Sequence, residues 1–134
     1  APWTLAAVEA RLGPRAGPVR IVPCPVADDR MTPPAPGGDG LVSVFHLAGW
    51  RNKNLAGLAA ATRLLRARGE AVPLTVIGGG PAGAVAECRR AIAAAPDIRL
   101  AGPIAPDALR RRLAGATGLV LASRRESFGL VLIE

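Results

Sequence analysis

The segment LVSVFHLAGWRNKNLAGLAAATRLLRARG, residues 41–69, decides the fold. Its first seven residues, 41–47, are mostly apolar, which indicates a buried strand. After a short polar loop, residues 54–68 carry apolar side chains at helical spacing, which indicates a helix with one buried face. Asn54 is typical of a helix N-cap and Gly69 of a helix end. A buried strand followed by an amphipathic helix is the unit of parallel α/β sheets.

The same unit recurs toward the C-terminus. We expect strands at residues 74–77, 98–101 and 118–122, and helices at 81–95 and 107–114. Strands that alternate with amphipathic helices form a parallel sheet covered on both faces. The sequence therefore predicts a Rossmann-like α/β domain with helices on both faces of the sheet. Ligands of such sheets bind where the loops leave the carboxyl ends of the strands.

The N-terminal third has a different pattern. Residues 2–12 have helical spacing, residues 19–22 are a short strand candidate, and residues 27–40 are rich in Asp, Pro and Gly. Pro and Gly clusters mark loops and linkers. We interpret residues 1–26 as the end of a preceding domain, 27–40 as the interdomain linker and 41–134 as the Rossmann-like domain.

The chain of 134 residues has a net charge of +7, carried by sixteen arginines and one lysine. Such a balance suits an anionic partner: nucleic acid, a membrane surface or a phosphorylated small molecule. Aromatic residues are only 3% of the chain. Nucleic-acid sites usually carry aromatic side chains among their basic residues, so we do not predict nucleic-acid binding. Cys24 and Cys88 match no metal or redox spacing, which favours a reduced, cytoplasmic protein.

The first loop, residues 49–54, reads Gly-Trp-Arg-Asn-Lys-Asn. The helix that follows presents unpaired N–H groups and a partial positive charge to a ligand. Arg51 and Lys53 add two cations there, which predicts a diphosphate site. The alternative is that both are solvated surface cations.

The second loop, residues 78–83, satisfies G-x-G-x-x-G between a strand and a helix. This pattern favours a flavin- or dinucleotide-binding oxidoreductase module, the main rival hypothesis. A dinucleotide site also requires an acid at the end of the next strand to hold the ribose. That strand ends Arg-Leu-Ala-Gly at 99–102, without an acid. The alternative is a tight turn that lets strand and helix pack closely.

The C-terminal stretch, residues 124–134, reads RRESFGLVLIE and places Glu126 eight positions before Glu134. Periodicity alone indicates a buried strand at its end. If Gly129 instead begins a helix, the N–H groups of Gly129 to Val131 point into the cleft. The two oxygens of the Glu134 carboxylate match a ribose diol, and Glu126 suits a sugar hydroxyl. The alternative is that both are ordinary exposed glutamates.

Together these segments resemble the donor-binding half of a retaining GT-B glycosyltransferase of family four, the group one type. FHLAGWRNKNLAGLAAATRLL (45–65) resembles the family's opening strand, phosphate loop and helix. LTVIGGGPAG (74–83) resembles its second strand and Gly-Gly-Pro turn, and residues 97–134 resemble the segment ending in Glu-x7-Glu. RIVPCPVADDRMTP (20–33) resembles the stretch joining the two domains, although Cys24 to Ala27 replace part of the family's Asn-Gly-Val-Asp.

The resemblance implies transfer of a sugar, with retention, from a nucleotide-diphosphate sugar to an acceptor that is a glycan, a lipid or a small molecule. It implies no required metal or other cofactor. By position, Glu126 would contact the donor sugar, Lys53 and Arg51 the diphosphate, and Glu134 the ribose. This loop is shorter than the family's common form, with Trp50 directly after the glycine. Further donor contacts would come from Gly49, Ile104, Phe128, Gly129, Leu130 and Val131.

The resemblance also implies chain on both sides of this segment. We expect an acceptor-binding domain whose end is residues 1–26, and a donor domain that continues beyond the second glutamate. We therefore expect this segment alone to bind the donor weakly and not to catalyse. Peripheral membrane contact through the acceptor-binding domain stays open. A third hypothesis is a non-catalytic interaction domain that kept the fold and lost the site.

Overall fold

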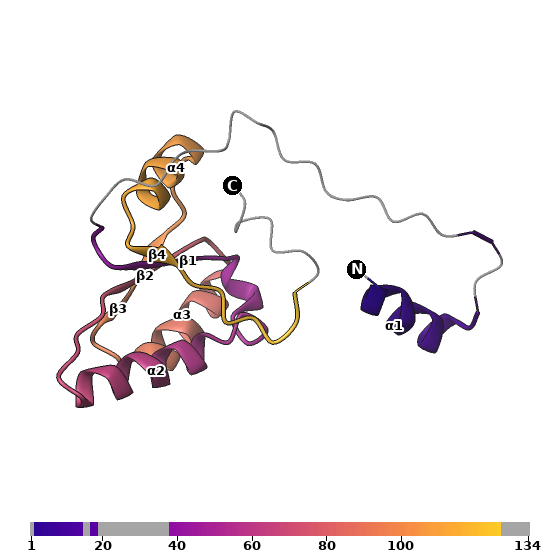
Figure 1. Ribbon diagram of the computed structural model, residues 1–134, viewed down its shortest axis with the longest axis horizontal. Coiled ribbons are helices and arrows are strands. Elements are labelled where there is room, and N and C mark those ends of the chain that lie inside the picture. The colour runs from indigo at the N-terminus through magenta and orange to yellow at the C-terminus, as the bar shows by residue number, and fades with distance from the viewer. Residues whose placement is uncertain (1, 15–16, 19–37, 127–134) are drawn as a thin grey trace.

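The computed structural model describes residues 2–14, 17–18 and 38–126 (Figure 1). The predicted strand at 19–22 and most of the predicted linker lie outside these residues, as does the C-terminal segment 127–134. The N-terminal helix α1 spans Pro2–Leu12, as its helical spacing predicts.

Within the described residues, four strands form one sheet, in which every pairing is parallel: β1 (Leu41–Val44), β2 (Leu74–Ile77), β3 (Ile98–Gly102) and β4 (Gly118–Leu119). Their order across the sheet is β3-β2-β1-β4. All four residues of β2 are buried, because this strand lies between two others and is covered on both faces. The prediction of a Rossmann-like parallel sheet is confirmed.

Three helices cover the sheet: α2 (Leu55–Ala67), α3 (Ala82–Ile92) and α4 (Pro106–Ala114). Figure 1 shows α2 and α3 on one face and α4 on the other. The reason is the right-handed crossover. The chain moves from β1 to β2 to β3 in one direction and then returns past β1 to β4, so the returning helix lies on the opposite face.

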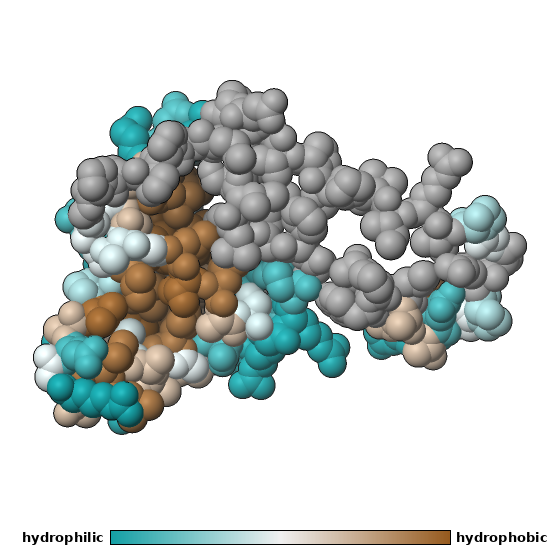
Figure 2. All heavy atoms as spheres, in the orientation of Figure 1, coloured by the Kyte–Doolittle hydropathy of each residue, from teal (hydrophilic) through white to brown (hydrophobic). Residues whose placement is uncertain are grey.

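The core lies between the sheet and the pair α2 and α3. Figure 2 shows the apolar side chains gathered over the central strands. Helix α2 buries four positions at spacings of three and four, Leu55, Leu58, Ala59 and Thr62. The helix ends at Ala67, and Gly69 just beyond it has φ +85°, as its predicted role in the helix end requires. Glu70 N donates to Leu65 O at 3.0 Å, which is the 6→1 hydrogen bond of such a helix end.

One local prediction is wrong and another is confirmed only in position. The strand predicted over 41–47 ends at Val44, and residues Leu47–Gly49 form a short 3-10 helix, η2. The His46 side chain begins that helix, because its Nδ1 accepts a hydrogen bond from Ala48 N at 3.3 Å. Asn54 occupies the N-cap position of α2 as predicted, but it adopts the left-handed conformation, φ 56° and ψ 43°, and its side chain caps no N–H group.

Other boundaries differ less. The last predicted strand, 118–122, is paired only as Gly118–Leu119, although Val120 N still donates to Val42 O at 2.8 Å. The helix predicted over 81–95 is the shorter α3. Its last turn gives way to a tighter one, in which Ala95 N donates to Ile92 O.

Candidate functional site

The strand order reverses between β1 and β4. From β1 the chain builds the sheet toward β3, and α4 then carries it back to β4 on the other side of β1. Loops leaving two such strands diverge to opposite faces, which opens a crevice at their carboxyl ends, where open α/β sheets bind ligands. The loop after β1, residues 45–54, and the loop after β4, residues 120–126, border this crevice.

Lys53 and Glu126 meet across this crevice. The Lys53 ammonium donates to Glu126 Oε2 although the two residues are 73 positions apart in the chain. Ser123 Oγ donates to the same carboxylate oxygen at 3.2 Å. The two side chains are 24% and 31% exposed, so the pair is partly screened from water yet open to a ligand. The structure thus brings together two of the residues predicted to act on the donor.

Asn52 joins the two loops directly. Its Nδ2 donates to Arg125 O at 2.9 Å, and its own carbonyl accepts from Arg124 N at 2.7 Å. A backbone bond and a side-chain bond from one residue fix both the spacing and the orientation of the loops. Lys53 and Glu126 therefore face each other on supports that are already connected.

Arg51 takes a different direction from Lys53. Its Nη1 lies 3.0 Å from Glu87 Oε2 on α3, and its guanidinium carbon lies 4.5 Å from the centre of the Trp50 ring, over which it stacks. Trp50 Nε1 donates to the same Glu87 oxygen at 2.9 Å. The indole hydrogen bond and the nearby Arg51 charge lower the pKa of Glu87. Arg51 is thus placed with Glu87 and not with Lys53.

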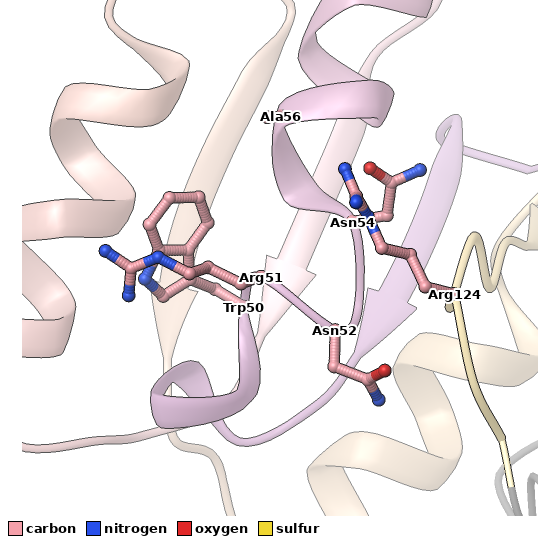
Figure 3. A pocket seen from close by; sticks show the side chains of 6 residues that line it. All are labelled: Trp50, Arg51, Asn52, Asn54, Ala56 and Arg124. Carbon is pink, nitrogen blue, oxygen red and sulfur yellow. The ribbon is translucent and has the colours of Figure 1, made fainter.

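A groove of about 410 Å³ opens over the start of α2 (Figure 3). Figure 3 shows Trp50 and Arg51 on one side, and Asn54 and Arg124 on the other. The basic residues Arg51 and Arg124 both line the groove, which favours an anionic ligand. Its lining residues are Trp50, Arg51, Asn52, Asn54, Ala56 and Arg124.

In the glycine-rich loop, residues 78–83, two of the glycines lie where close packing leaves no room for a side chain. Gly78 has φ +150°, and a Cβ there would lie 1.9 Å from the Phe45 carbonyl oxygen. At Gly80 a Cβ would approach Leu47 Cβ at 3.0 Å, whereas at Gly83 it would meet nothing within 4 Å. In a dinucleotide fingerprint the third glycine lets helix and strand pack closely. The open space at Gly83 therefore disfavours the flavin- or dinucleotide-binding alternative.

The remaining predicted site residues fall into two groups. Gly49 ends η2 and has open space where a side chain would be, while Ile104 is 37% exposed in the loop between β3 and α4. Both lie in loops at the carboxyl end of the sheet. Outside the described residues lie Phe128, Gly129, Leu130, Val131 and Glu134, together with the predicted helix start at Gly129.

Three neighbours of the predicted residues were missed by sequence reasoning. Ser123 stands three positions before Glu126, so its proximity in sequence was a usable signal. Asn52 lies inside the predicted phosphate loop, but no sequence pattern indicates its hydrogen bonds to the other loop. No pattern indicates the role of Glu87 either, because an acid on an amphipathic helix usually belongs to the solvated face.

Within residues 2–14, 17–18 and 38–126, no group of three or more His, Cys, Asp or Glu side chains could hold a metal ion. None of the described helices is both long and apolar enough to cross a membrane.

Fold and site together define an α/β protein with a cation–carboxylate pair at the switch point of a parallel sheet. The family model described as "Glycosyl transferases group 1" matches residues 40–134. The chain belongs to this family, which indicates that its chemistry is sugar transfer. No curated protein matches the chain.

Proposed function

We propose that residues 41–134 form the donor-binding domain of a retaining GT-B glycosyltransferase that uses a nucleotide-diphosphate sugar. The observation that carries this proposal is the contact between Lys53 and Glu126 at the switch point. A cation and an acid from distant segments converge there at the edge where such sheets bind their ligands.

The chemistry follows from the two charges. Departure of a nucleoside diphosphate leaves negative charge on its phosphate oxygens, and a preorganised ammonium stabilises that charge as it develops. Lys53 supplies the ammonium. A carboxylate accepts hydrogen bonds from sugar hydroxyls, so Glu126 would orient the sugar beside the phosphate that Lys53 holds. Their contact in the structure supports one site for both halves of the donor.

The other donor contacts extend this proposal to the rest of the crevice. Ile104 would meet the base through its backbone, and Gly49 would let the phosphates approach the loop, where the structure has open space. Glu134 would bind the ribose hydroxyls, with Phe128 to Val131 lining the pocket. We further propose that residues 1–26 end an acceptor-binding domain and that 27–40 link it to the donor domain.

The test measures donor binding by calorimetry with the protein encoded by the complete reading frame. UDP-, GDP- and ADP-sugars are titrated separately. Lys53→Ala is expected to weaken binding about tenfold or more, because a charge-assisted hydrogen bond contributes about 1.5–3 kcal/mol. Glu126→Gln is expected to lower the transfer rate more than the affinity.

Matched controls remove the same charges elsewhere. Arg63→Ala deletes an exposed cation of α2, and Glu70→Gln neutralises an exposed acid just after that helix. Neither control should change donor binding. The proposal fails if no nucleotide sugar binds, or if Lys53→Ala binds the donor as tightly as Arg63→Ala does. Binding without any transfer would instead support the non-catalytic hypothesis.

A further inference from the structure

Both cations of the loop after β1 are engaged by carboxylates, but on different elements. Lys53 contacts Glu126 of the loop after β4, whereas Arg51 contacts Glu87 of α3. A diphosphate carries about two negative charges, which Lys53 alone does not balance. Arg51, the second cation of the same loop, is therefore the nearest group that would neutralise the remaining charge of a bound diphosphate.

Arg51 is held by few contacts. Its side chain is 71% exposed and, among residues 2–14, 17–18 and 38–126, forms an ion pair with Glu87 and stacks on Trp50. Trp50, by contrast, packs partly buried against the core and donates its indole N–H to Glu87 at 2.9 Å. Trp50 and Glu87 thus form a fixed support, and the guanidinium is the part that moves most easily.

We propose that Glu87 is a positioning residue, which holds Arg51 against Trp50 until the donor diphosphate replaces the Glu87 carboxylate as its partner. The inference rests on the proposed function, because it requires a diphosphate at the loop. Arginine binds phosphate through two parallel hydrogen bonds, which is a stronger arrangement than its single 3.0 Å contact with Glu87. Exchange of partners is therefore favourable, and the cost of breaking the Glu87 contact lowers the apparent donor affinity.

The consequence is a gain of affinity on removing one negative charge. Glu87→Gln keeps an oxygen acceptor for the Trp50 indole and so retains the support, but it no longer attracts the guanidinium. Exposed ion pairs are weak, so we expect nucleoside diphosphates to bind only about two- to fivefold more tightly. In an Arg51→Ala background the same Glu87→Gln change should have no effect, while Arg51→Ala alone should weaken binding.

The experiment titrates UDP, GDP and ADP into the protein encoded by the complete reading frame and its three variants, by calorimetry. The indole N–H signal of Trp50 is followed by NMR and is assigned by its disappearance in Trp50→Phe. In the wild type this signal should shift on saturation as the guanidinium leaves the ring. In Arg51→Ala it should stay where it is. A merely structural role of Glu87 would not make the shift depend on Arg51.

The outcomes separate the two proposals. Equal or weaker binding by Glu87→Gln, with Lys53→Ala still impaired, overturns the role of Glu87 and leaves the proposed function intact. The role of Glu87 is also overturned if Arg51→Ala alone leaves affinity unchanged, a result that does not depend on how Glu87→Gln folds. Absence of any nucleoside diphosphate binding in the wild type overturns both.

Discussion

Replacing Gly78 with alanine tests whether the glycine-rich loop serves packing. The backbone there has φ +150°, which disfavours any residue with a Cβ, and the added carbon would lie 1.9 Å from the Phe45 carbonyl oxygen. The obstacle is backbone and not the end of a flexible side chain, so the loop itself must move. That movement also disturbs the bonds from Gly78 N to Gly102 O and from Leu47 N to Gly79 O, at 3.0 and 2.8 Å.

The expected loss is large for a one-carbon change. A sparsely populated backbone conformation costs about 1–3 kcal/mol, and forcing an extra carbon into a closely packed site costs about 1–3 kcal/mol. We therefore expect Gly78→Ala to lower the free energy of unfolding by about 2–6 kcal/mol. Gly83→Ala is the matched control. It lies in the first turn of α3 with nothing within 4 Å of an added Cβ, so it should stabilise the protein by up to about 1 kcal/mol.

The assay is urea unfolding of both variants followed by far-UV circular dichroism, with the slope compared to confirm a common unfolded state. Opposite signs for the two glycines are the expected result. If Gly78→Ala is neutral, or if Gly83→Ala is the more destabilising variant, then the packing explanation is wrong. The dinucleotide fingerprint, whose third glycine must stay bare, would regain support.

Two further predictions concern titratable groups. The hydrogen bonds from Arg66 lower the pKa of the Asp97 carboxyl, so this ion pair stabilises the protein above about pH 4. Its contribution disappears as the pH falls through the lowered pKa, so the difference in Tm between the wild type and Asp97→Asn should narrow in acid; a constant difference would contradict this. Burial raises the pKa of the Cys88 thiol, which is 0% exposed, so a thiol reagent should modify it only as fast as the protein unfolds. Rapid modification at neutral pH in a Cys24→Ser background would refute that expectation.

The alternation of strands and helices was predictable because burial imposes a period on the sequence. A strand enclosed on both faces is apolar throughout, as in β2, and a helix with one buried face repeats its apolar residues every three or four positions, as in α2. The end of a helix was also predictable, because it depends on a local backbone conformation. Gly69 ends α2 because the next turn requires a positive φ.

The segment between β1 and α2 was predicted less well, since its backbone depends on partners elsewhere. Leu47 N is satisfied by Gly79 of the neighbouring loop, so the chain leaves the strand early and turns into η2. Asn54 sits in the left-handed region directly over Gly57, where a Cβ would come within 2.5 Å of its side-chain nitrogen. The local pattern of apolar and polar residues indicates neither of these contacts.

For the candidate site, the sequence by itself determined which chemical groups the loops carry: a lysine before α2 and a glutamate after β4. Whether these groups meet was decided only by the tertiary structure. The crossover through α4 returns β4 to the side of β1, which closes the distance between Lys53 and Glu126. The same packing places α3 beside the loop after β1, so that Arg51 forms its ion pair with Glu87 and points away from Lys53. Sequence spacing encodes local periodicity, whereas contacts between distant loops depend on the direction in which the chain crosses the sheet.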